Sequence, residues 1–149
     1  MSGFGYRNLG FGGGNFVVED FDIPNSMRFD ATSVYLTRTP GSAGNLRKFT
    51  FSCWFKMGNA EVNQKIFQQR TDSNASQQFS INISNSSYIR LIDQNDSGDN
   101  EMVKDTDALL RDPSAWYHIM CAIDTEDDTA EDRQKLYING VRVTSWATD

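Results

Sequence analysis

The sequence of 149 residues has few of the side chains that build metal centres, with one histidine and two cysteines. Zinc sites need four nitrogen or sulfur ligands, or three and a water, so most zinc chemistry is excluded. Positive charge is also scarce, because 14 Lys and Arg stand against 20 Asp and Glu, for a net charge of -6. A chain this acidic lacks the basic surface that nucleic acids and anionic membranes attract, so we expect neither as a partner.

Long apolar runs are absent as well. No run of about 18 apolar residues exists, so we expect no membrane-spanning helix and no membrane insertion. The first residues carry no basic region followed by an apolar stretch, so we expect no signal peptide. Disulfides are typical of secreted proteins, so Cys53 and Cys121 are expected to be buried free thiols.

The N-terminal segment differs in character from the rest of the chain. Six of the 11 glycines lie within residues 1–16, which makes this segment costly to order on its own. One interpretation is a flexible leader. The other is an arm over residues 1–23 that orders when its aromatic side chains dock on a partner, since aromatics are common interface anchors. The docking residues would be Phe4, Tyr6, Phe11 and Phe16.

From residue 24 onward, alternating apolar and polar residues predict short β-strands. In residues 49–57, Phe49, Phe51 and Phe55 fall on one face at a period of two. Residues 115–124 are apolar on both faces, which favours a central strand covered on both sides. Further strands are predicted at residues 26–30, 34–38, 65–70, 77–84, 88–93, 135–138 and 141–144.

Turn residues separate these segments. Asn139-Gly140 between two alternating runs is a strong hairpin signal, because both central residues of a type I′ turn need positive φ. Residues 93–101 are predicted to be a polar loop, and residues 105–112 one helical turn closed by Pro113. About nine short strands and almost no helix predict an all-β sandwich or barrel. Its expected core is Phe49, Phe51, Phe55, Phe79, Ile81, Ile119, Cys121, Ile123, Leu136 and Ile138.

Five segments in this order resemble a known family: NSMRF (25–29), YLTRTP (35–40), FTFSCWFK (49–56), RDPSAWYHI (111–119) and KLYINGV (135–141). They resemble concanavalin A-like, laminin G-like jelly-roll domains, most closely those of tail fibre and other virion proteins of marine bacteriophages. The resemblance implies a two-sheet antiparallel jelly-roll sandwich over residues 24–149. It also implies a non-enzymatic virion protein of a tail fibre or appendage, made in the host cytoplasm, that recognises a host surface glycan.

Two other functions stay open. A capsid decoration or adaptor subunit would bind only other virion proteins. A glycan-degrading enzyme would need paired carboxylates, which the glycosidases of this superfamily place on a Glu-x-Asp-x-Glu strand. The nearest approach is Glu19-Asp20-Phe21-Asp22, which lacks a third acid in register, and the sole histidine, His118, lies within a predicted strand. We therefore expect no catalytic residues.

Calcium is the one metal that the residue types suit. Asp93, Asn95, Asp96 and Asp99 offer hard oxygen ligands within a short stretch. An EF-hand does not fit, because the twelfth position from Asp93 is Lys104 where a bidentate Glu is required. We expect a solvated acidic loop there, a similar one at residues 125–132, and no cofactor.

Glycan binding calls for an exposed aromatic side chain. Trp54 and Trp116 lie in strands that look central, so we expect both in the core. Trp146 is the candidate for glycan contact, since it lies close to the end of the chain, where no predicted strand covers it.

The last nine residues allow one strand after the Asn139-Gly140 turn. The strands that close the sandwich in the relatives would then be missing, leaving an exposed sheet edge that invites pairing with another chain. We therefore expect an obligate assembly, a homo-oligomer or a virion-bound subunit, with residues 1–23 at the contact between subunits.

Overall fold

The computed structural model describes residues 24–29, 34–39, 41–42, 44–45, 47–59, 61–70 and 77–148. The chain divides into two compact units, Met1–Leu36 and Thr37–Asp149. The strands predicted over residues 26–30 and 34–38 are wrong for their described residues, which form no regular secondary structure and are exposed. Their alternation fits a strand, but a strand also needs a neighbour to pair its backbone, and none of the described strands pairs with them.

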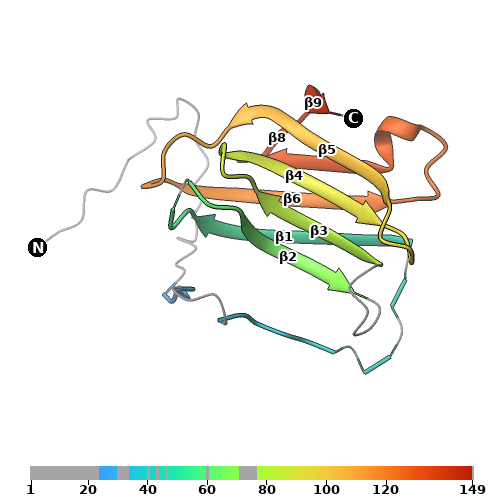
Figure 1. Ribbon diagram of the computed structural model, residues 1–149, viewed down its shortest axis with the longest axis horizontal. Coiled ribbons are helices and arrows are strands. Elements are labelled where there is room, and N and C mark those ends of the chain that lie inside the picture. The colour runs from blue at the N-terminus through green and yellow to red at the C-terminus, as the bar shows by residue number, and fades with distance from the viewer. Residues whose placement is uncertain are drawn as a thin grey trace, which may run out of the picture. The chain divides into compact units, whose positions relative to one another are not determined.

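The second unit is built from β-strands, which Figure 1 labels. They are β1 (Lys48–Lys56), β2 (Gln64–Arg70), β3 (Gln78–Ile83), β4 (Tyr88–Gln94), β5 (Asn100–Leu109), β6 (Trp116–Asp124), β7 (Gln134–Ile138), β8 (Val141–Arg142) and β9 (Trp146–Thr148), with one 3-10 turn, η1 (Ala130–Asp132). One sheet has the order β1-β6-β7-β8 and the other β2-β3-β4-β5-β9, and every pairing is antiparallel. The predicted all-β, two-sheet sandwich is confirmed.

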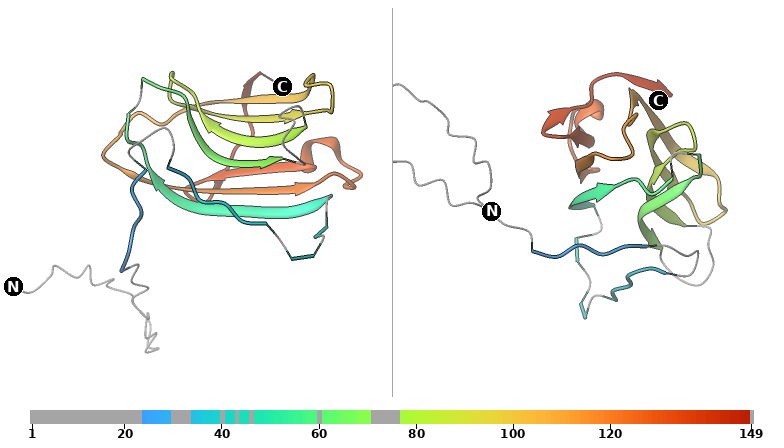
Figure 2. Two further views of the ribbon diagram at one scale, coloured as in Figure 1. Left: turned by 60° about the horizontal axis from the view of Figure 1, so that its bottom comes forward. Right: turned by 90° about the vertical axis from the view of Figure 1, so that its left-hand side faces the viewer.

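The two sheets form separate layers, as Figure 2 shows, and the core residues lie between them. Ring contacts cross from one layer to the other: the centroids of Phe51 on β1 and Phe67 on β2 lie 4.6 Å apart. Phe49 on β1 meets Phe79 on β3 edge to face at 5.5 Å. Such pairs add to the free energy gained from burying the rings.

The predicted core residues all belong to the hydrophobic core between the two sheets or pack against it. Five are buried: Ile81, Ile119, Cys121, Ile123 and Leu136. The others are half-buried and pack against them: Phe49, Phe51, Phe55, Phe79 and Ile138. Both cysteines are free. Burial raises the pKa of the Cys53 thiol to about 11 and that of Cys121 to about 12, so both stay protonated near neutral pH.

The Asn139-Gly140 hairpin is confirmed, with φ of 51° and 80° at the two residues. After it, the chain differs from the expectation of a single strand. β8 completes the hairpin on the four-stranded sheet, and β9 then joins the five-stranded sheet by pairing Trp146 with Thr106 of β5. The closing segment therefore contributes an edge strand to each layer.

Residues 105–112 do not form the predicted helical turn. β5 runs through Leu109 and pairs with β4, with Asp105 opposite Arg90. Pairing with β4 on one side and β9 on the other satisfies the backbone as a strand, and this outweighs the local preference for a turn before Pro113. Among the described residues, no helix reaches the length and apolarity that crossing a bilayer requires.

Leu136 provides a test of this core, because its side chain is fully buried on β7. Leu136→Ala should lower the free energy of unfolding by about 2–5 kcal/mol, through lost burial and the cavity left behind. Val141→Ala, at an exposed position of the neighbouring strand, should change it by less than about 0.5 kcal/mol. Urea unfolding followed by circular dichroism measures both, and equal effects would contradict the sandwich packing.

Candidate functional site

The outer face of the four-stranded sheet is set by how β1 pairs with β6. The register runs from Lys48 opposite Asp124 to Lys56 opposite Trp116. Successive side chains of a strand point to opposite faces, so the residues between Phe49, Phe51, Cys53 and Phe55 point away from the core. On β1 these outward residues are Thr50, Ser52 and Trp54 between the two lysines, and the outward residues of β6 lie opposite them.

The aromatic end of this face holds two exposed tryptophans. Trp54 is 55% exposed and Trp116 is 52% exposed. Trp54 lies opposite His118, and Trp116 is two residues before His118, so the two indoles are diagonal neighbours across β1 and β6. The expectation that both lie in the core is wrong, because the described chain places no second layer over this side of the sheet.

His118 supports Trp54 from the neighbouring strand. The two ring centroids are 5.0 Å apart with a 40° tilt. A hydrogen bond of 2.8 Å joins the His118 Nε2 to the Ser52 Oγ. The backbone N–H of His118 also donates to the Asn139 Oδ1 at 2.9 Å. The Ser52 bond orients the imidazole, which packs against the Trp54 indole.

Toward the other end of β1, the same face hollows into a shallow pocket of about 340 Å³. Thr50 and Ala122 are opposite each other on β1 and β6 and line it with small side chains. Phe49 and Ile123 also line it, and so do four charged residues: Lys48, Asp124, Asp132 and Lys135. Between the pocket and the aromatic end lie Ser52 and Met120.

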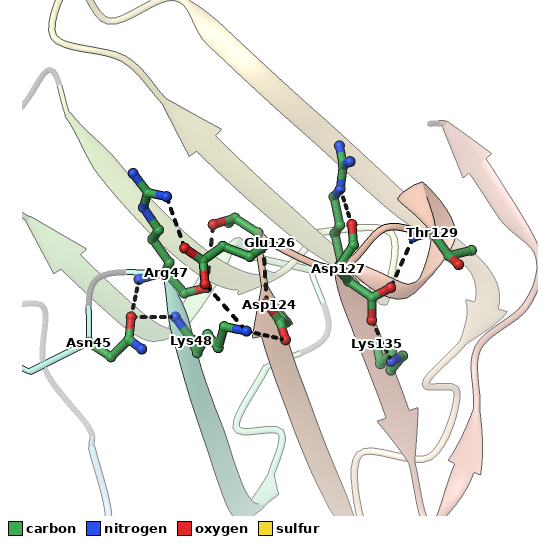
Figure 3. Close-up of polar contacts among 10 residues, drawn as sticks. Asn45, Arg47, Lys48, Asp124, Glu126, Asp127, Thr129 and Lys135 are labelled. Atoms are coloured by element: carbon green, nitrogen blue, oxygen red, sulfur yellow. Dashed lines mark hydrogen bonds and ion pairs between the residues drawn. The ribbon is translucent and has the colours of Figure 1, made fainter.

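Every charge in the lining of this pocket is paired, as Figure 3 shows for Lys48, Asp124 and Lys135. The Lys48 Nζ lies 3.2 Å from the Asp124 Oδ2 and 3.3 Å from the Glu126 Oε2. The Lys135 Nζ lies 3.5 Å from the Asp127 Oδ2 and 3.8 Å from the Asp132 Oδ1. The polar end of the face is therefore a set of fixed ion pairs.

The contacts of Glu126 and Asp127 favour the ionised form of these two carboxyls. Hydrogen bonds from Arg47 and Lys48 hold the pKa of the Glu126 carboxyl below its ordinary value. The backbone N–H of Thr129, with help from Lys135, lowers the pKa of Asp127 in the same way. A general acid for glycoside hydrolysis needs a raised pKa, so neither carboxyl is suited to donate a proton at neutral pH.

The outer face of the five-stranded sheet is polar, and many of its side chains form hydrogen bonds with one another. A row of amides crosses four strands, with Gln68 donating to Gln78, Gln78 to Gln94, and Gln94 to Asn100. On another row, the Arg90 guanidinium donates two hydrogen bonds, of 2.6 and 2.7 Å, to the buried Asp105 carboxylate. A ligand here would have to compete with these internal bonds.

Trp146, the sequence-based candidate for glycan contact, lies on β9 and is half-buried against the core. The Lys104 ammonium lies 5.3 Å from the centroid of its ring. Trp146 also lines a smaller pocket of about 200 Å³. Its indole is therefore less available to solvent than those of Trp54 and Trp116.

The four residues proposed for calcium lie at the end of β4 and in the turn to β5. The Asn95 Oδ1 accepts the backbone N–H groups of Ser97 and Asp99, both at 3.0 Å, so this oxygen shapes the turn. Asp93 lies on β4, and burial raises the pKa of its carboxyl. Asp96 and Asp99 are exposed. Among the described residues, no group of three or more His, Cys, Asp or Glu side chains is arranged to hold a metal ion.

Several sequence-based candidates lie outside the described residues. They are the proposed anchors Phe4, Tyr6, Phe11 and Phe16, and the acidic segment 19–22. Sequence reasoning missed Trp54 and Trp116 as surface residues. The signal for Trp54 was present, because Thr50, Ser52 and Lys56 share its face and indicate a solvent-facing side.

Comparison with known families identifies one match. A family model of laminin G type, described as the concanavalin A-like lectin/glucanases superfamily, matches residues 30–148. This match spans the strands of both sheets and confirms the resemblance to concanavalin A-like, laminin G-like domains. Comparisons with curated proteins and with solved structures give no match.

The exposure of the three tryptophans can be tested by acrylamide quenching of their fluorescence. The double variant Trp54→Phe with Trp116→Phe should lose most of the quenchable emission, because its remaining indole, Trp146, is half-buried beside Lys104. Trp146→Phe is the matched control and should keep the steep quenching of the native protein. Equal quenching in both variants would contradict the exposed pair.

Proposed function

The chain belongs to the concanavalin A-like lectin/glucanase superfamily, and on that premise we propose that it is a non-enzymatic carbohydrate-binding protein of a bacteriophage virion. Its glycan-binding surface is the outer face of the four-stranded sheet. The observation that carries this proposal is the diagonal pair of exposed tryptophans, Trp54 and Trp116, on the same sheet face as a pocket lined by paired charges.

Exposed tryptophans suit a sugar for physical reasons. Leaving two large apolar rings in water is unfavourable, and clustered exposed apolar side chains generally mark interaction sites. A pyranose has faces of C–H groups that can stack on an indole and a rim of hydroxyls that needs hydrogen bonds. The indole faces serve the first need. Ser52 can bond the hydroxyls of a sugar stacked there, and the pocket carboxylates and ammoniums can bond those of another sugar of the same glycan.

The same face supports binding without hydrolysis. Retaining glycosidases place two carboxyl groups about 5–5.5 Å apart, one of them protonated. On this face, Asp124 is paired with Lys48 and Asp132 with Lys135. On the other sheet, the outward residues of β3 are Gln78, Ser80 and Asn82, which are amides and a hydroxyl where alternating carboxylates would be needed.

The virion context is supported by the sequence resemblance to phage tail fibre proteins, and the appendage that we propose would touch the host surface. A structural role is the second candidate, and one observation favours it. β1 and β2 are the outer strands of their sheets, each paired with a single described strand. The inward phenylalanines of β1 are only half-buried, so this edge is suited to pairing with another chain.

Glycan binding is tested on the full chain with an array of defined oligosaccharides, followed by calorimetry on the best ligand. Trp54→Ala should weaken binding by about tenfold or more, as expected when a stacking anchor is removed. Val141→Ala, exposed at the far edge of the same sheet, should bind like the native protein. Binding unchanged in Trp54→Ala, or no glycan bound on the array, would overturn the proposal.

Assembly is tested by deleting residues 1–16. If the aromatic residues of this segment anchor neighbouring subunits, the native chain should be an oligomer by light scattering and the deletion should shift it toward monomer. The melting temperature of the remaining domain should change little, because the described core lies within residues 49–138 and 143–146. A native monomer that also binds no other virion protein would contradict the structural role.

A further inference from the structure

The candidate face has two separate features along the same two strands, an aromatic row and a pocket. The aromatic row, Trp54 with His118, is four residues along β1 and β6 from the pocket row, Thr50 with Ala122. At roughly 3.3 Å per residue, the rows are about 13 Å apart. A pyranose ring built from bonds of about 1.5 Å spans about 5 Å, so one sugar cannot reach both rows.

The row between them does not interrupt the face. Ser52 and Met120 lie opposite each other there, a small hydroxyl and an unbranched thioether. The Ser52 hydroxyl bonds His118 and keeps acceptor capacity for a sugar hydroxyl. A linear chain laid along the strands therefore contacts an indole, then this middle row, then the pocket.

The charges of the pocket argue against an anionic ligand. Lys48 is engaged by Asp124 and Glu126, and Lys135 by Asp127 and Asp132. A sulfate or carboxylate entering the pocket would have to displace one of these carboxylates and would approach the others at close range. The net charge of -6 for the whole chain adds a long-range repulsion for polyanions.

The same ion pairs are well suited to uncharged hydroxyl groups. An ammonium has three donors and a carboxylate about four acceptor positions, so each member of a pair keeps free capacity. Asp124 also accepts the backbone N–H of Glu126 at 3.1 Å, which fixes its direction. Groups held in place before the ligand arrives lose little entropy on binding it.

We infer that this face binds an uncharged linear glycan along β1 and β6 over about three sugar units, with one ring stacked at Trp54 and another seated in the pocket beside Thr50 and Ala122. The inference rests on the proposed function and names the ligand class of that site. A binder of single terminal sugars, or of acidic glycans, would need a different arrangement of the same groups.

The first experiment uses an array that presents neutral, carboxylated and sulfated forms of the same oligosaccharide backbones. The strongest ligand should be neutral, with the charged forms at least tenfold weaker. Calorimetry on that ligand at lengths of one to six units should then show affinity rising at least tenfold from one unit to three, and less than twofold from four to six. A charged strongest ligand, or a single sugar that binds as well as the trimer, would overturn the inference while leaving glycan binding itself supported. An array on which no glycan binds would overturn both this inference and the proposed glycan binding.

Variants at Thr50 and Trp54 separate the contributions of the pocket and the aromatic row to glycan affinity. Thr50→Phe fills the pocket at an exposed strand position where an aromatic is tolerated. It should reduce trimer affinity to that of a shorter ligand and leave single-sugar affinity unchanged. Thr50→Ser is the matched control that keeps the pocket open and should bind the trimer like the native chain. Trp54→Ala should weaken ligands of every length. If Thr50→Phe, shown by circular dichroism to be folded, binds the trimer with native affinity, the pocket is not part of the site.

Discussion

The antiparallel register between β1 and β6 is the constraint on which both the core and the candidate face depend. Because side chains alternate at a period of two, a slip of one residue would turn Phe51 outward and Trp54 inward, and reverse every other position along the strand. With Phe51 opposite Cys121 and Trp54 opposite His118, the apolar set of both strands meets the other sheet. The same pairing leaves the two indoles together on the outside.

Contacts at both ends of the strands maintain this register. At one end, the Lys48 ammonium pairs with Asp124, and the backbone N–H of Thr125 donates to the Arg47 carbonyl at 2.9 Å. At the other end, Ser52 and Trp54 engage the His118 ring. Exposed ion pairs contribute little stability singly, so their role here is to define geometry at the strand ends more than to stabilise the fold. The candidate site therefore uses the same side chains that fix the pairing of the strands.

The sequence predicts the strands whose patterns are local and leaves the others undetermined. In β1 and β3, apolar residues alternate with polar ones, and these strands and the Asn139-Gly140 turn follow directly. β5 does not alternate: its sequence, NEMVKDTDAL, is mostly polar, and it is a strand because β4 and β9 pair with it. The pairing with β9 is between segments far apart in sequence, which no local pattern reveals.

The burial of the tryptophans was predicted wrongly for the same reason, because it too depends on segments that no local pattern reveals. Trp54 and Trp116 are apolar residues at outward positions, and whether they are buried depends on whether another layer covers the sheet. For β6, apolar side chains on both faces favour a covered strand, yet the described chain leaves Trp116 exposed. For β1, the polar neighbours Thr50 and Ser52 were sufficient to indicate that the outward face, and Trp54 with it, faces solvent. Trp146 seemed exposed because it follows the last clear strand, whereas β9 returns it to the core.

The distribution of satisfied hydrogen bonds decides which sheet is the better binding surface. On the five-stranded sheet, the amides of the row bond to one another, and Arg90 bonds to Asp105. The Oδ1 of Asn82 is the one buried side-chain polar atom in the described chain without a partner. A ligand there would exchange protein bonds for its own, with little net gain. On the four-stranded sheet, a ligand that covers Trp54 and Trp116 removes apolar surface from water without breaking a protein hydrogen bond, so the free energy available for binding is concentrated on that face.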